Sequence, residues 1–200
     1  MNPTFDLMPL LTRFNDVDNF QNETAFFLTR TPTIARQAYL NVLFKPARVE
    51  LRAEISRKLA LTADLQAFYG LYNGACLFGS GLNIYGFRDV GQLLKRSDPF
   101  SLPPFDIVKA NYDLHESLRL RGLVCFAAYS YDRSFVCSDR ESARVHCFVG
   151  DRSTETRQTW PTLENWLGSE IARISALFDV QGTPLVPEEQ LLPNASAGLP

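Results

Sequence analysis

The sequence predicts an α+β domain in which helices pack on one face of a mainly antiparallel sheet. Three patterns predict it: helical periodicity before residue 73, short alternating segments over residues 75–149, and an amphipathic stretch over residues 162–178. With 200 residues, 46% of them hydrophobic, the chain suits one domain with short additions, because it can bury a core without disulfide or metal support.

The first part of the chain, residues 1–46, is expected to form a helical N-terminal extension. Apolar side chains follow an approximate 3.6-residue period over residues 3–14, interrupted at Pro9, and a second helix is expected over residues 33–44. Pro46 fits the first position of a third helix, where its missing N–H is not needed. Alternating charges along that helix indicate a solvent-facing side.

A fourth helix is expected over residues 63–72. Thr62 is a suitable N-cap, and Asn73-Gly74 ends the helix because both residues tolerate left-handed backbone conformations. An aromatic stripe at i, i+3, i+4 and i+7 faces a core. Its members are Leu65, Phe68, Tyr69 and Tyr72.

Strands are expected from residue 75 onward. Two short ones flank Gly79-Ser80-Gly81, and the second, residues 82–85, alternates as a half-buried strand does. Asp89 is expected to cap a short helix through Leu94. Residues 96–122 carry three prolines and no sustained period, which predicts a long ordered excursion without regular structure.

The clearest β signal lies in residues 123–149. Three apolar segments separated by polar turns at residues 131–133 and 139–143 predict an antiparallel meander. After a polar stretch, Thr162 introduces a last amphipathic helix to residue 178. Residues 180–200 are rich in proline and are expected to be a mobile tail that can be removed without loss of the fold.

One core is expected to collect the inward side chains of these elements. Its predicted members are Leu65, Phe68, Tyr69, Tyr72, Ile84, Phe126, Trp166 and Ile171.

Charge and cysteine content limit the function classes. The formal net charge of −2 lacks the basic excess typical of nucleic-acid-binding domains. No apolar stretch is long enough for a membrane helix, and Asp6 within an N-terminus that has no basic segment argues against a secretory signal. Four cysteines without a C-x-x-C pair indicate a reduced, cytoplasmic protein.

Motifs for catalysis or metal binding are weak. His146 and Cys147 are adjacent strand residues that point to opposite faces, and no metal-binding spacing occurs. The cysteines lie in apolar contexts that suppress thiol reactivity, although counting alone leaves a Cys–His pair open. The acidic residues Asp132, Asp139 and Glu141 occupy turns at opposite ends of one strand, too far apart for a glycosidase pair.

Five short motifs resemble the SMI1/KNR4 domain of the SUKH superfamily. In order they are Leu61 to Tyr69, Tyr72-Asn73-Gly74-Ala75, Leu82 to Phe87, Phe126 to Asp132, and Trp160 to Leu167. The resemblance covers residues 47–179. Thr62 departs from the family pattern, which usually has proline there.

The resemblance implies a mixed, mainly antiparallel sheet with helices packed on it, no cofactor and no catalytic residues. Bacterial members of the family are immunity proteins that neutralise toxin domains by binding them, so we expect a cognate toxin as the partner, without nucleic acid or membrane. Fungal members are regulatory interaction proteins, which gives the alternative of a regulatory or scaffold protein. A small enzyme that uses cysteine or histidine is a third interpretation.

The meander turns are the expected docking site, because tyrosine and arginine often anchor interfaces. The alternative is that they are ordinary solvated hairpin tips, in which case the binding face would move to residues 96–122. The candidate partner-binding residues are Tyr129, Tyr131, Asp132, Arg133, Asp139, Arg140 and Glu141.

Overall fold

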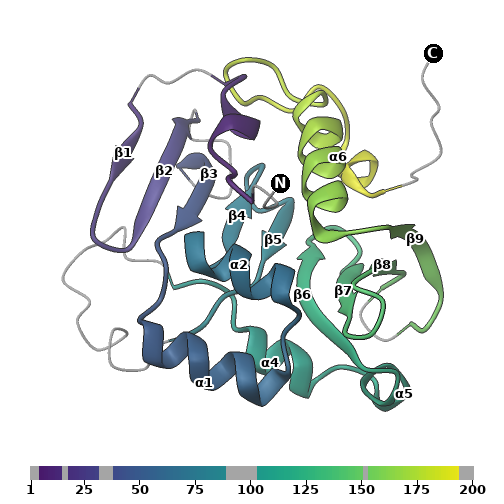
Figure 1. The fold of residues 1–200 in the computed structure, drawn as a ribbon. Coiled ribbons are helices and arrows are strands. Elements are labelled where there is room, and N and C mark those ends of the chain that lie inside the picture. The colour runs from purple at the N-terminus through teal and green to yellow at the C-terminus, as the bar shows by residue number, and fades with distance from the viewer. Residues whose placement is uncertain (1–4, 15–17, 32–37, 89–102, 151–152, 194–200) are drawn as a thin grey trace.

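One antiparallel sheet organises the molecule and confirms the α+β class. The computed structural model describes residues 5–14, 18–31, 38–88, 103–150 and 153–193. In these residues nine strands lie in the sheet in chain order, so that β1 and β9 are its two edges (Figure 1). The strands are β1 (Phe20–Gln21), β2 (Ala25–Arg30), β3 (Tyr39–Phe44), β4 (Ala75–Leu77), β5 (Leu82–Ile84), β6 (Leu123–Tyr129), β7 (Phe135–Asp139), β8 (Val145–Phe148) and β9 (Thr156–Trp160).

The predicted helical N-terminal extension is wrong. Only a short 3₁₀ turn, Pro9–Leu11, occurs in its described part, and β2 and β3 follow it. β3 pairs with β4, so the sheet runs across the expected boundary at residue 46. Because β3 is buried on both faces, its apolar run is continuous, and periodicity cannot distinguish such a run from a buried helix.

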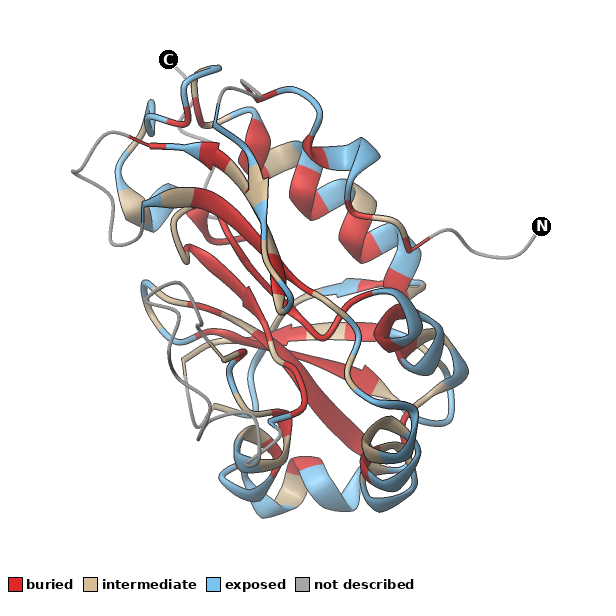
Figure 2. Cartoon of the chain, turned by 90° about the vertical axis from the view of Figure 1, so that its left-hand side faces the viewer, coloured by how far each residue is buried: buried red, intermediate tan, exposed pale blue. Residues whose placement is uncertain are grey.

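Three helices cover one face of the sheet: α1 (Val49–Leu59), α2 (Ala63–Leu71) and α6 (Leu163–Ser175). The side chains of Thr62 and Thr162 accept hydrogen bonds from the N–H groups of Leu65 and Asn165, which confirms Thr62 as the N-cap of α2. The eight residues predicted to share a core all lie in the cluster beneath these helices. Figure 2 shows this burial concentrated on the strands and the inward sides of the helices. We refer to this side as the helical face.

The Asn73-Gly74 and Gly86-Phe87 motifs meet at the end of β5. The Asn73 amide donates to the carbonyl of Phe87 at 2.9 Å and accepts from its N–H at 2.7 Å. A Cβ atom at Gly86 would lie 2.0 Å from the Asn73 carbonyl oxygen, so only glycine fits there. These motif residues therefore join the segment that follows α2 to the segment that follows β5.

The excursion predicted over residues 96–122 contains regular structure in its described part. Two short helices form there, α4 (Ile107–Tyr112) and α5 (Glu116–Leu120), which correct the prediction. They pack beside β6 with a second apolar cluster that includes Leu118 and Phe135. The helix predicted from Asp89 to Leu94 lies outside the described residues.

A ninth strand, β9, forms one edge of the sheet, where the sequence indicated only a polar stretch. Its residues are mostly exposed or half-buried because an edge strand has one neighbour. Without a buried face it lacks the apolar alternation that identifies a strand.

The C-terminal segment contains ordered structure in its described part. A 3₁₀ turn, Glu188–Leu191, precedes Leu192, and both Leu191 and Leu192 belong to the main core. Arg173 of α6 donates to the Leu191 carbonyl at 2.6 Å. The prediction that everything after residue 179 is mobile is therefore wrong for residues 180–193, because long-range packing outweighs their proline-rich composition.

Candidate functional site

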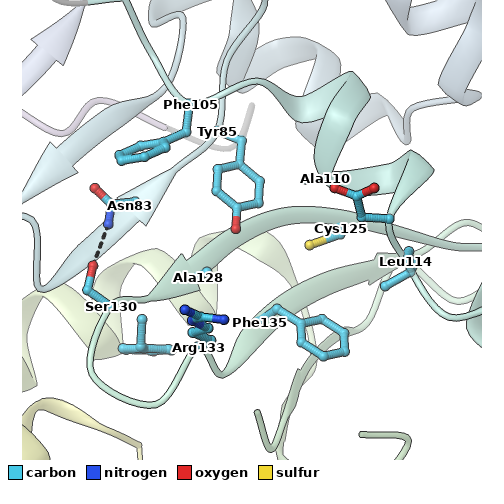
Figure 3. Close-up of a pocket in the computed structure, with 12 residues that line it drawn as sticks. Asn83, Tyr85, Phe105, Ala110, Leu114, Cys125, Ala128, Ser130, Arg133 and Phe135 are labelled. Carbon is cyan, nitrogen blue, oxygen red and sulfur yellow. Dashed lines mark hydrogen bonds between the residues drawn. The ribbon is translucent and has the colours of Figure 1, made fainter. Parts of the chain in front are cut away.

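The sheet is hollowed on the face opposite α2 and α6. The hollow has a volume of about 640 Å³ and lies between β5, β6, the β6–β7 turn and the end of α4 (Figure 3). We call it the sheet hollow. Its lining residues are Asn83, Tyr85, Phe105, Ala110, Asp113, Leu114, Cys125, Ala128, Tyr129, Ser130, Arg133 and Phe135.

Strand alternation brings β5 side chains to this hollow. Leu82 and Ile84 enter the main core, whereas Asn83 and Tyr85 point to the opposite face and line the hollow. The alternating pattern of residues 82–85 therefore places polar and aromatic groups on the face that helices α2 and α6 leave uncovered.

A β-bulge in β6 shapes the floor of the sheet hollow. The register with β7 shifts between Cys125 and Ala127, so Phe126 and Ala127 both turn to the main core. Cys125 and Ala128 consequently both face the hollow, although strict alternation would place them on opposite sides.

Asn111 fixes α4 as one wall. Its amide donates to the carbonyl of Cys125 at 2.7 Å and accepts from the N–H of Cys125 at 2.8 Å. The pairing of β5 with β6 ends at Ala127, so the buried Asn111 side chain replaces a neighbouring strand at this position. Asp106 caps α4 by accepting from the N–H groups of Val108 and Lys109.

The hollow contains one buried polar atom without a partner. Asn83 donates through Nδ2 to the carbonyl of Ser80 at 3.0 Å and to Ser130 Oγ at 2.8 Å (Figure 3). Its Oδ1 accepts no hydrogen bond from any residue that the structure describes. A buried acceptor left without a donor costs free energy, and the chain encloses this oxygen, so the loss belongs to the fold and not to a ligand site.

Two aromatic side chains stand over the floor. The ring centroids of Tyr85 and Phe105 are 6.4 Å apart with an interplanar angle of 59°, and Phe105 is 47% exposed. Burial raises the pKa of the Tyr85 hydroxyl well above its ordinary value, and the nearby Cys125 and Cys137 raise it further. The hydroxyl is therefore neutral at physiological pH and can donate a hydrogen bond.

The first predicted turn contributes to the hollow only in part. Arg133 lines it, with a positive φ of 59°, and Tyr131 beside it is 50% exposed. Asp132 is held by Arg157, at 2.6 Å between oxygen and nitrogen. Tyr129 contributes to the lining, but its side chain is buried and its hydroxyl donates to Glu170 at 2.7 Å, so it cannot present its ring to a partner.

The second predicted turn lies apart from the hollow. Asp139 accepts hydrogen bonds from the Ser142 hydroxyl at 2.7 Å and the Glu141 N–H at 2.8 Å. Burial opposes the charged form, but these bonds outweigh it and lower the pKa of Asp139 below its ordinary value. Arg140 donates to the Leu59 carbonyl at 2.9 Å, so Asp139 stabilises its own turn, Arg140 binds the end of α1, and Glu141 is exposed.

Sequence reasoning missed Tyr85, Phe105 and Asp113 as site residues. The alternation over residues 82–85 signalled that Tyr85 differs from its neighbours in orientation, but not what it faces. Phe105 and Asp113 lie in the excursion that was the alternative docking region.

The four cysteines are buried, and both histidines make side-chain contacts within the chain. Burial raises the pKa of Cys76 and of Cys147 to about 12, so both remain protonated thiols at neutral pH. His146 Nδ1 lies 3.0 Å from the Thr159 hydroxyl, and His115 accepts from the Ser117 N–H at the start of α5. Within the described ranges, no three His, Cys, Asp or Glu side chains gather as metal ligands.

None of the helices described is both long and apolar enough to span a bilayer. No family model, no curated protein and no solved structure matches this chain. The resemblance to the SUKH superfamily therefore rests on the sequence motifs alone.

Proposed function

We propose that this chain is a non-catalytic protein-binding module of the immunity type, which neutralises a toxin domain by docking it at the sheet hollow and the adjoining β6–β7 turn. Neutralisation is by occlusion of the partner's working surface, and the chain contributes no chemistry. The sequence motifs support the toxin as partner, and the surface around the hollow supports its location.

The observation that carries the proposal is a concave surface with one exposed aromatic side chain in its lining and two more on the segments that form its walls. Phe105 lines the hollow, Tyr112 precedes the lining residue Asp113 and is 80% exposed, and Tyr131 lies two residues before the lining residue Arg133. Aromatic and arginine side chains are the types that most often carry the binding energy of interfaces.

The framework behind this surface is held rigidly, which favours tight binding. Asn111 fixes α4 to β6, and the Asp132–Arg157 ion pair fixes the turn that carries Tyr131. A surface that is already ordered loses less conformational entropy when a partner binds.

The test uses the protein encoded immediately upstream as the candidate partner. Isothermal titration calorimetry should show binding to the full chain, and co-expression should relieve the growth defect that the partner causes. Phe105→Ala should weaken binding by about thirtyfold, because it removes a central aromatic anchor.

Leu185→Ala is the matched control, since Leu185 is 62% exposed but does not line the hollow. It should leave the affinity unchanged. Equal affinities for the folded Phe105→Ala variant and the wild-type chain would remove the hollow from the interface, and no binding by the wild-type chain would contradict the toxin partner.

A further inference from the structure

We propose that the sheet hollow receives an arginine side chain from an extended segment of the protein partner. The guanidinium lies over the rings of Tyr85 and Phe105 and pairs with Asp113. The proposal rests on the proposed function and identifies the chemistry that the hollow recognises.

The aromatic pair gives the hollow an affinity for a flat cation. Tyr85 and Phe105 come from different segments, and their rings stand 6.4 Å apart at a tilt of 59°. Phe105 is exposed and Tyr85 is half-buried, so ring surface is accessible from the hollow. A guanidinium stacks on such rings better than an ammonium, because it is planar and more weakly hydrated.

Asp113 supplies the opposite charge. It is exposed on the α4 side of the hollow, and its carboxylate makes no hydrogen bond or ion pair with the rest of the chain that the structure describes. The other acidic residue of α4, Asp106, already caps that helix. Asp113 is therefore an acceptor available for a bidentate contact with arginine.

Asn83 forms part of the other side of the hollow. Asn83 is 5% exposed, the two contacts of Nδ2 fix its amide orientation, and its Oδ1 is enclosed by the chain. Figure 3 shows Asn83, Ser130 and Arg133 on one side of the hollow. Ala110 and Leu114, which lie within three residues of Asp113 in the sequence, are on the other side. A cation that pairs with Asp113 therefore binds on the side away from Arg133.

The test titrates the full chain with capped single residues, followed by amide NMR spectroscopy. The probes are N-acetyl-arginine methylamide, the neutral isostere N-acetyl-citrulline methylamide, and N-acetyl-glutamate methylamide. We expect saturable shifts from the arginine probe at residues 83–85 and 110–114, with citrulline binding about two- to fivefold more weakly. Asp113→Asn should reduce that preference without disturbing the fold, because Asp113 is exposed and the rings of Tyr85 and Phe105 remain.

Three results would overturn the inference: equal binding of arginine and citrulline, a preference for glutamate, or no shift at these residues with any probe. Binding of the intact partner separates this failure from failure of the proposed function. Asp113→Asn should weaken that complex by about two- to fivefold, and Glu116→Gln, an exposed control outside the hollow, should not. If Phe105→Ala weakens the complex but Asp113→Asn does not, the docking face stands and the arginine inference is wrong.

Discussion

The two faces of the sheet receive side chains from the same strands, yet they differ in how completely these are covered. On the helical face, Trp166 packs edge-to-face on Phe126 with ring centroids 5.0 Å apart, and both are buried. On the other face, Tyr85 and Phe105 leave ring surface exposed around a hollow. The helical face carries most of the stability, whereas the hollow face keeps aromatic and polar groups available for recognition.

Strand β6 shows how one segment serves both faces. Val124, Phe126, Ala127 and Tyr129 enter the main core, and Cys125 and Ala128 line the hollow. The bulge after Cys125 changes the phase of alternation in the middle of the strand. A substitution in β6 therefore affects one face or the other according to its place in the alternation, which changes phase at the bulge.

The largest expected effect of a single substitution is on the helical face. Trp166→Ala should lower the free energy of unfolding by about 3 to 5 kcal/mol, because it leaves a cavity against Phe126. Urea denaturation followed by circular dichroism measures it. Tyr112→Ala, at an 80% exposed position, should change stability by less than about 0.5 kcal/mol. Similar losses for the two variants would contradict the distinction between the faces.

Truncation after Asp179 should also weaken the helical face. The shortened chain loses the buried Leu191 and Leu192 and the carbonyl that Arg173 contacts, a loss of roughly 2 to 4 kcal/mol. Thermal and urea unfolding measure it. A chain that ends at Pro193 keeps these contacts and should retain nearly full stability. Unchanged stability after truncation at Asp179 would show that the segment adds nothing to the core.

Asn111→Ala tests the hollow face. It leaves the N–H and carbonyl of Cys125 without partners and frees α4, so stability should fall by about 1 to 3 kcal/mol. Hydrogen exchange should accelerate at residues 107–112 and 125 but not in α6. If hydrogen exchange in α6 accelerates as much as it does in α4, the two faces unfold as one unit.

The smallest expected effect is the pH dependence from His146, which shares a face with Cys137 through their strand pairing. Burial lowers its pKa below the ordinary value of about 6.5, and Arg121 and Arg144 act in the same direction, opposed by Asp139. The unfolded chain therefore takes up this proton first. The contribution is complete above about pH 6.5 and is lost as the pH falls through the folded-state pKa.

Urea unfolding of the wild type and His146→Asn between about pH 7.5 and 5 isolates this effect from other titrating groups. The wild type should lose stability on acidification more steeply than the variant. Parallel curves would mean that His146 has the same proton affinity in the folded and unfolded chain.

Local sequence signals were sufficient for much of the helical face. Thr62 and Thr162 begin helices by bonding N–H groups three residues away, and the stripe from Leu65 to Tyr72 specifies which side of α2 is buried. The meander could be predicted because polar turns separate its apolar segments. Such signals act between residues within one or two turns of the chain.

Three features depended on residues far apart in the sequence. β3 is a strand because β2 and β4 pair with it on both sides, Leu191 is buried because Arg173 and the core hold the chain there, and Tyr85 lines a hollow because α4 and the β6–β7 turn surround it. By itself the sequence determined the α+β class, the starts of α2 and α6 and eight members of the main core, since these follow from periodicity and capping. The tertiary structure alone decided that β2 and β3 belong to the sheet, that Leu191 and Leu192 are buried and which surface is concave, because pairing and burial between distant segments override local propensity.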